Sequence, residues 1–189
     1  MTKKLRFVLA LAAVLVLCGT TQAEERKYQD LISGAAVPSS FDFNGDGLKA
    51  HYVTFAGRSS LGPVHGAFLV EYDFPAVAPN PACPNGTLKL PILVSSSNRA
   101  VTETEGQIFL RDEISSALFC LNPATGEFTM SLNGIFTGGL GKFAGATGTY
   151  QYKGRGQVQL LDKIGMPFGG FVLETEGRLV LPNRPPDRD

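Results

Sequence analysis

Strict alternation of apolar and polar residues marks the last third of the chain. Phe128, Met130 and Leu132 are each followed by a polar residue, and the same two-residue period runs through Tyr150–Leu160 and Phe171–Leu181. Because successive side chains of a strand point to opposite faces, this period predicts strands with one buried face and one solvated face.

The middle of the chain predicts further short strands, divided by turns rich in Gly, Pro, Asn and Asp. No long segment combines a 3.6-residue period with helix caps, so the pattern indicates an all-β domain with about eight strands, in an antiparallel barrel or sandwich. Glycines inside the strands (Gly154, Gly156 and Gly177) favour a single antiparallel barrel, because glycine permits sharp coiling and close backbone approach. The expected strands span residues 51–58, 64–72, 87–96, 98–104, 107–111 and 117–121, followed by the three alternating segments.

The first 23 residues have the composition of a secretory signal peptide. Three basic residues within positions 3–6 precede the apolar run Phe7–Leu17, and small residues stand three and one positions before a cut after Ala23. We therefore expect cleavage there and a periplasmic or secreted mature protein. A lipoprotein signal ending at Cys18 is the alternative, although a small residue would normally stand where Leu17 is.

The rest of the chain divides into three parts. Residues 24–40 are weakly patterned and are expected to be a lead-in segment, residues 41–182 form the β-barrel domain, and residues 183–189 are a polar tail. The 17 basic and 17 acidic residues balance, so nothing suggests nucleic acid as a partner. The apolar run of the signal is shorter than the about 20 residues of a spanning helix, and no later stretch predicts a membrane span in the mature form.

Two cysteines remain once the signal is removed. An even pair in an oxidising compartment predicts a disulfide between Cys83 and Cys120, with a free reactive thiol as the alternative. Zinc is disfavoured, because the chain has only two histidines and no C-x-x-C motif.

A glycine-rich segment at 138–148 predicts a tight turn between two strands. Glycine permits positive φ there, Phe143 can plug the turn into the core, and Ala146 is small enough for close packing. The segment matches neither G-x-G-x-x-G before a helix nor a Walker motif, which argues against a phosphate loop. The residues of this structural turn are Gly138, Gly139, Gly141, Phe143, Gly145, Ala146 and Gly148.

This segment resembles the GG-x-G-x-F-x-G-A-x-G turn of the allene oxide cyclase and dirigent barrel superfamily, except that Leu140 stands where Thr or Ser is common. Residues 40–181 are similar to an uncharacterised branch of bacterial secreted proteins of this type. The shared features are F-D-x-N-G-D-G at 41–47, a cysteine before a strand (Cys83) and L-x-C-L-x-P around Cys120.

The resemblance implies an eight-stranded antiparallel barrel, hollow or packed, and a homo-oligomer, namely a trimer. The catalytic groups of the plant proteins do not carry over, because no matching motif places them on this chain.

Asp42, Asn44 and Asp46, followed by Gly47, look like the first half of a calcium loop, with oxygen ligands at positions 1, 3 and 5. Position 12, where a bidentate Glu is expected, is Val53, and no helix pattern follows. A plain turn explains the same residues. Ca²⁺ at this turn is therefore kept as one alternative, and no other cofactor is expected.

Two further groups of residues are candidates for catalysis. Glu103 and Glu105 would share one strand face as an acid/base pair, although exposed acids at strand ends are commoner. His51 and His65 lie on neighbouring expected strands, but no Ser in a G-x-S-x-G setting and no unpaired Cys completes a nucleophilic set.

Aromatic residues on the strands fit either a packed core or an apolar pocket inside the barrel. The leading hypothesis is a non-catalytic exported barrel that binds a small apolar ligand or a protein partner. The alternatives are a cyclase- or dirigent-type enzyme and a calcium-stabilised structural module of the cell envelope. The candidate ligand-binding residues are Tyr52, Phe68, Tyr72, Phe109, Phe128, Tyr150, Tyr152 and Phe171.

Overall fold

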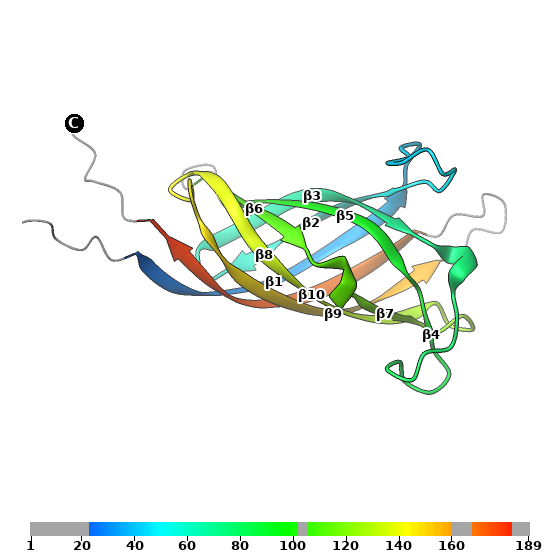
Figure 1. The fold of residues 1–189 in the computed structure, drawn as a ribbon. Coiled ribbons are helices and arrows are strands. Elements are labelled where there is room, and N and C mark those ends of the chain that lie inside the picture. The colour runs from blue at the N-terminus through cyan, green and yellow to red at the C-terminus, as the bar shows by residue number, and fades with distance from the viewer. Residues whose placement is uncertain (1–22, 102–105, 160–167, 183–189) are drawn as a thin grey trace, which may run out of the picture.

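The protein is built from one strongly curled antiparallel β-sheet (Figure 1). The computed structural model describes residues 23–101, 106–159 and 168–182. The strands are β1 (Glu24–Pro38), β2 (His51–Ser59), β3 (Gly62–Tyr72), β4 (Leu88–Lys89), β5 (Ile92–Val101), β6 (Gly106–Asp112), β7 (Leu118–Leu121), β8 (Glu127–Gly141), β9 (Thr147–Gln159) and β10 (Phe168–Leu181), with two short 3-10 helices, η1 (Phe74–Ala76) and η2 (Ile114–Ser116).

Three expected features lie outside the described residues: the signal peptide up to residue 22, the tail 183–189, and the acids Glu103 and Glu105. In the part that is described, no helix is long and apolar enough to cross a membrane.

The pairing of β8 with β9 returns the sheet to its own other edge. From β8 the order runs through β6, β5, β3, β2, β1, β10 and β9, and β9 pairs again with β8. The early part of β8 also pairs with β7, which carries the two-residue β4 on its other side. The all-β class and the barrel-like antiparallel sheet predicted from the sequence are thereby confirmed.

The expectation that residues 24–40 are a lead-in segment is wrong. Residues 24–38 form β1, which pairs with β10 on one side and β2 on the other. The alternation in this strand was hidden because two neighbouring positions interrupt it: Asp30 points inward and is buried, whereas Leu31 points outward and is 54% exposed. The folded sheet therefore begins at Glu24 rather than at residue 41.

Glycines on inward-facing positions make room for large side chains. A Cβ added at Gly134 on β8 would lie 2.2 Å from the ring of Tyr150, and one at Gly156 would lie 2.5 Å from the ring of Phe128. These contacts give a physical reason for glycine in the middle of strands, where it otherwise weakens a sheet.

The connection from β8 to β9 is a tight reversal. Gly141, Gly145 and Gly148 have φ values of 63°, 77° and 128°, in the region that favours glycine. Phe143 is 2% exposed and belongs to the hydrophobic core, so the turn is anchored from inside. Figure 1 shows this turn at the end of the sheet where β1 starts and β10 finishes.

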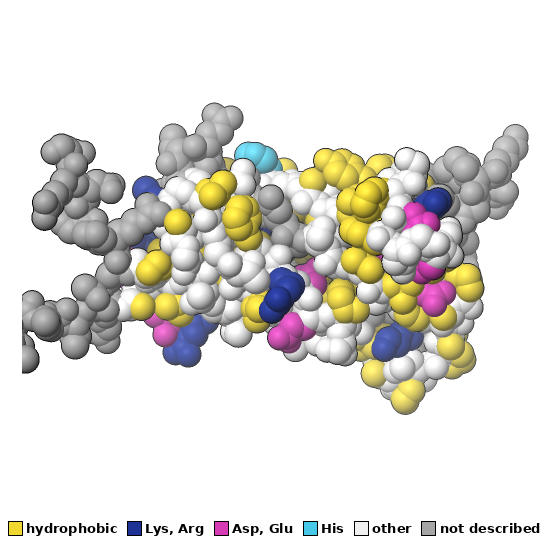
Figure 2. All heavy atoms as spheres, turned by 45° about the horizontal axis from the view of Figure 1, so that its top comes forward, with side chains coloured by type: hydrophobic (Ala, Val, Ile, Leu, Met, Phe, Trp, Pro, Cys, Tyr) yellow, Lys and Arg dark blue, Asp and Glu magenta, His cyan; other side chains and the backbone are white. Residues whose placement is uncertain are grey.

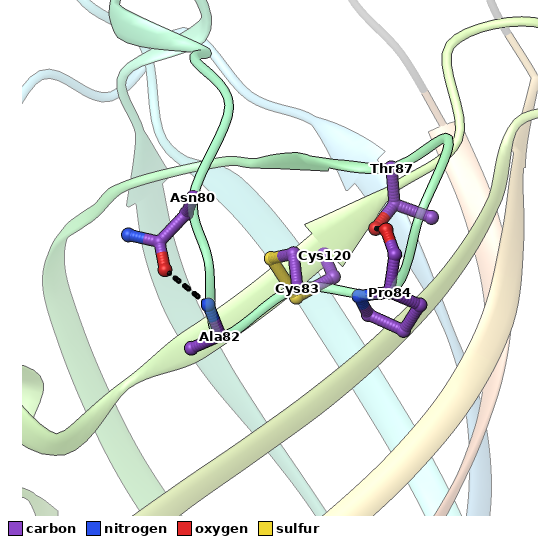
Figure 3. The surroundings of a disulfide bond; sticks show 6 residues. All are labelled: Asn80, Ala82, Cys83, Pro84, Thr87 and Cys120. Carbon is purple, nitrogen blue, oxygen red and sulfur yellow. Dashed lines mark hydrogen bonds between the residues drawn. A yellow bond between two sulfur atoms is a disulfide. The ribbon is translucent and has the colours of Figure 1, made fainter.

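The predicted disulfide is confirmed. Cys83, in the loop between η1 and β4, is bonded to Cys120 on β7, with 5.5 Å between the Cα atoms (Figure 3). The loop around it is ordered by local hydrogen bonds: Asn80 Oδ1 accepts from the amide of Ala82, and Thr87 Oγ1 donates to the carbonyl of Pro84. The bridge ties this long loop to the sheet.

Candidate ligand cavity in the barrel interior

A cavity lies inside the curled sheet near the end of β1 and the start of β2. It offers about 50 Å³ to the centre of a water-sized molecule, which is several times the roughly 10–15 Å³ needed to hold one water and about a third of a cavity of roughly 150 Å³ that takes benzene. Its aliphatic wall includes Val53, Val70, Leu90, Ile92 and Leu173. Its aromatic wall consists of Phe68, Tyr72, Phe74, Phe119, Phe128, Tyr152 and Phe171.

The aromatic wall is a connected set of ring contacts. The Tyr72 ring lies 5.3 Å from His51, 5.8 Å from Phe74 and 5.5 Å from Phe119, measured between centroids. Phe119 in turn stacks on Phe128 at 4.6 Å. Because Phe119 precedes Cys120 on β7, the disulfide lies directly behind this part of the wall.

The structure brings together five of the eight predicted ligand-binding residues. Phe68, Tyr72, Phe128, Tyr152 and Phe171 line the cavity.

The other three predicted residues lie elsewhere. Tyr150 is buried but does not line the cavity. Tyr52 stands between the buried residues His51 and Val53, so it points outward and is 45% exposed. Phe109 is likewise half-buried, between inward-facing neighbours on β6. The expectation that Tyr52 and Phe109 line a pocket is therefore wrong, because aromatic type alone does not reveal the face of a strand.

A carboxylate lies just behind the cavity wall. Asp112, near the end of β6, accepts one hydrogen bond from the hydroxyl of Tyr150 and another from Ser95 Oγ, each at 2.5 Å. Ser95 itself lines the cavity. Both oxygens of Asp112 are thus used, and the bonded protons of Ser95 and Tyr150 point at the carboxylate rather than into the cavity.

A second polar cluster fills the interior toward the opposite end of the sheet. Arg99 Nη1 forms an ion pair with Asp30 Oδ2 and donates to Thr175 Oγ1 at 3.1 Å, while the Tyr28 hydroxyl donates to Asp30 at 2.8 Å. The Arg99 guanidinium also lies 5.5 Å from the ring centre of Phe55. Burial alone would lower the pKa of Arg99, but Asp30 and Tyr28 raise it above its ordinary value. The cation is therefore kept and neutralised in place.

Burial sets the state of the interior tyrosines. It raises the pKa of Tyr28, Tyr72, Tyr150 and Tyr152, and for the last three the nearby Asp112 raises the pKa further. All four hydroxyls are consequently protonated near neutral pH and are able to donate a hydrogen bond. Tyr28 and Tyr150 have protein acceptors, whereas neither Tyr72 nor Tyr152 donates to another residue of the described part.

A further buried acid lies beside the cavity. Glu71 stands on β3 between Val70 and Tyr72, both of which line the cavity, and it is fully buried. Neither of its carboxylate oxygens has a hydrogen-bond partner. Because Val70 and Tyr72 face the cavity, Glu71 between them points to the opposite face of β3 and is not part of the cavity wall.

The predicted calcium loop is held by its own hydrogen bonds. Asp42 accepts from the amides of Gly45 and Gly47 and from Lys49 Nζ, and Asp46 accepts from the amide of Leu48. Desolvation is the largest single influence and opposes ionisation of Asp42, but these donors together outweigh it and lower its pKa. Across the described ranges, no group of three or more His, Cys, Asp or Glu is arranged for a metal. Calcium at this turn stays a prediction of the sequence.

The two histidines do not meet. His51 faces inward and lines the cavity, whereas His65 is exposed and pairs in register with Ala56 on β2. They form no common site.

The interior ion pair and the Ser95–Asp112 contact were not predicted from the sequence. A signal for the first was present in the two-residue spacing of Tyr28, Asp30 and Ile32, which all face inward. For Arg99 no such signal exists, because a charged residue within a strand normally faces solvent.

The outer surface is mostly uncharged on the side of β3 and β5. Figure 2 shows apolar and uncharged atoms over most of this face, with charged side chains few and scattered.

Scans against protein-family models, curated proteins and solved structures each found no match for the chain.

Proposed function

We propose that this protein is an exported β-barrel that binds a small apolar ligand in its interior cavity and catalyses no reaction on it. The observation that carries the proposal is the cavity wall, in which aliphatic and aromatic side chains from most of the strands surround an unfilled space. Ligand sites are typically concave, mostly apolar and equipped with a few polar groups. A partner protein, the other half of the sequence hypothesis, has no comparable feature in its support.

The finer architecture is part of the same proposal. We infer an eight-stranded barrel of the allene oxide cyclase and dirigent type, working in the periplasm or outside the cell after cleavage at Ala23, and assembling as a trimer. The ring of eight strands and the glycine-rich β8–β9 turn support the fold assignment. Export rests on the composition of the first 23 residues, and the trimer rests on the resemblance alone.

The proposal is tested by filling the cavity from β1. Ala36 lines the cavity, whereas its neighbour Ala35 is exposed on the outer face, so Ala36→Leu and Ala35→Leu add the same atoms to opposite sides of one strand. Each buried methylene group contributes about 0.8 kcal/mol to binding, so even a small hydrocarbon gains measurably from the cavity.

Xenon, a single apolar atom, is titrated into the mature protein and followed by amide and methyl chemical shifts. We expect saturable binding to wild type and Ala35→Leu, and at least tenfold weaker binding to Ala36→Leu. Equal binding by the two variants, or no saturable binding to wild type, contradicts the proposal.

A cyclase-type enzyme is the second candidate, favoured by the hydrogen bond between the cavity residue Ser95 and the buried Asp112. This pair puts a hydroxyl and a carboxylate at the cavity wall, where they would be placed for proton transfer. Turnover of a bound molecule that is lost in Asp112→Asn, while xenon binding persists, would replace the non-catalytic proposal by this one.

A further inference from the structure

We propose that Asn85, in the disulfide-linked loop, is a site of spontaneous deamidation, and that the fold confines this reaction to one of the three Asn-Gly pairs of the chain. The pairs are Asn44 with Gly45, Asn85 with Gly86, and Asn133 with Gly134. The inference concerns the outer surface and is independent of ligand binding in the cavity.

Deamidation of asparagine needs only the side-chain amide, the next backbone nitrogen and water. The nitrogen of the following residue attacks the side-chain carbonyl carbon, a C–N bond forms, and the amide group leaves as ammonia with the proton of the attacking N–H. Water then opens the succinimide ring at either carbonyl and leaves Asp or isoaspartate. Glycine in second place favours ring closure, because it has no Cβ to obstruct the approach. All three pairs have these residues, so the surrounding structure decides which of them reacts.

Asn85 and Gly86 are the two central residues of a β-turn, and both reacting groups are free. The turn is closed by the amide of Thr87, which donates to the carbonyl of Pro84 at 3.1 Å, and Figure 3 shows these two flanking residues. Asn85 and Gly86 are exposed. In the described part of the chain, neither the Asn85 side chain nor the Gly86 amide makes a hydrogen bond. A Cβ placed on Gly86 would meet nothing within 4 Å, so there is open space for the ring to form.

Asn44 is also exposed, but hydrogen bonds hold both of its reacting groups. Its Nδ2 donates to Asp46 Oδ2 at 2.9 Å, and its Oδ1 accepts from the Asp46 amide at 3.1 Å. The attacking group is occupied as well, because the amide of Gly45 donates to Asp42 Oδ1 at 2.7 Å. Exposure therefore does not separate this loop from the turn at Asn85, whereas hydrogen bonding does.

Asn133 is held by the sheet. It lies in β8 and pairs with Gln151 on β9, whose Nε2 donates to Asn133 Oδ1 at 3.1 Å. The next residue, Gly134, pairs with Tyr150 on β9 and with Asp112 on β6, so the strand is fixed on both sides. Ring closure requires the Asn backbone to rotate away from the extended conformation, which would open the ladder at this point.

The reaction changes the charge beside an outer groove. Pro84 and Thr87, on either side of the reacting pair, line this groove together with Arg155 on β9. Within the described residues, Arg155 forms no ion pair and no hydrogen bond. Each deamidated molecule gains a negative charge next to this groove, and the isoaspartate form also lengthens the main chain of the loop by a carbon atom.

The test follows the three asparagines in one sample of the folded mature protein, kept in mildly alkaline buffer so that the attacking nitrogen loses its proton more readily. Portions are stopped in acid at intervals and digested with pepsin, and fragment masses locate each amide nitrogen that has been replaced by oxygen. We expect Asn85 to react at least about tenfold faster than Asn44 or Asn133, because local structure protects the latter two. In the reduced chain unfolded in guanidinium chloride, which is the matched control, the three rates should converge.

Asp42→Ala separates protection by hydrogen bonding from an effect of the neighbouring sequence. It removes the acceptor of the Gly45 amide in a surface loop. The Asn44 rate should rise at least about threefold, the lower end of the range for one hydrogen bond, while the Asn85 rate stays the same. An unchanged Asn44 rate would overturn the claim that hydrogen bonds confine the reaction.

Asn85→Gln identifies the source of the ammonia that the folded protein releases. The longer side chain disfavours ring closure, so release should fall to a small fraction of the wild-type amount. Undiminished release would place the reaction elsewhere and overturn the proposal. The same conclusion would follow from equal rates at Asn85 and Asn44 in the folded protein, or from an Asn85 that stays intact while the unfolded chain reacts.

Discussion

The two ends of the barrel interior treat buried tyrosines in opposite ways. Toward the β8–β9 turn, Tyr28 donates to Asp30, which Arg99 holds in an ion pair, and the space is filled. Toward the disulfide-linked loop, Tyr72 and Tyr152 face an unfilled cavity and donate to no described residue. Asp112 lies between these regions and accepts from one group of each, Tyr150 and Ser95.

The difference separates a part of the interior that maintains the fold from a part that is available for binding. Charges taken out of water must be paired and hydrogen-bonded, and the polar end pairs Arg99 with Asp30, although Asp30 Oδ1 and Arg99 Nε have no hydrogen-bond partner among the described residues. The cavity end has donors without acceptors, which costs little only while water or a ligand can reach them. The predictions below act on one end at a time.

The largest effect is expected from breaking the ion pair. Arg99→Met leaves the Asp30 carboxylate buried without its cation, and loss of one partner of such a pair typically costs about 3–5 kcal/mol of unfolding free energy. Urea denaturation of the mature protein measures this. The double variant Arg99→Met/Asp30→Leu should recover much of the loss. A single variant as stable as wild type would show that the polar end does not maintain the fold.

Removal of the disulfide should loosen mainly the cavity end of the interior. Replacing Cys83 and Cys120 by Ala opens a loop with a sequence separation of 37, for which removal of a native bridge typically costs about 2–4 kcal/mol. Because Phe119 beside the bridge belongs to the cavity wall, amide exchange should accelerate in β7 and its neighbours on β8. Equal acceleration around Tyr28 on β1 would contradict this division of the interior.

The smallest effect is expected when the hydroxyls of Tyr150 and Tyr152, two positions apart on β9, are removed one at a time. Tyr150→Phe removes a donor to Asp112 and should cost about 1–3 kcal/mol, because the buried carboxylate loses a partner. Tyr152→Phe removes a hydroxyl with no protein acceptor and should change stability by less than about 0.5 kcal/mol. Thermal or urea unfolding of the two variants measures the difference. Similar losses in both would mean that the Tyr152 hydroxyl has a role in the fold.

Much of the architecture follows from alternation alone. The period of two between Phe128 and Leu181 predicts the long strands β8, β9 and β10 and their buried faces, and cysteine parity predicts the bridge. The strand β1 was missed for a physical reason: Asp30 inward and Leu31 outward interrupt the alternation that Tyr28 and Ile32 otherwise follow.

The candidate site was less predictable than the fold. Five of the eight aromatic residues predicted from the sequence line the cavity. The sequence does not reveal which face of the sheet Tyr52 or Phe109 occupies until the register is known. Ser95 and Asp112 lie on the neighbouring strands β5 and β6, two positions beyond the register pair Ser97–Leu110, so their contact depends on the register of these two strands. Whether space is left unfilled depends on all these side chains together.

The measurement that tests the account most directly is where a small apolar molecule lies when bound. Changes in the methyl chemical shifts of the mature protein on addition of xenon locate the bound atom without any substitution. We predict changes at the cavity residues Val53, Val70 and Leu173, and none at Leu179 or Val64 at the filled end of the interior. Changes only at methyl groups of the outer face, or none that saturate, would contradict an interior binding cavity.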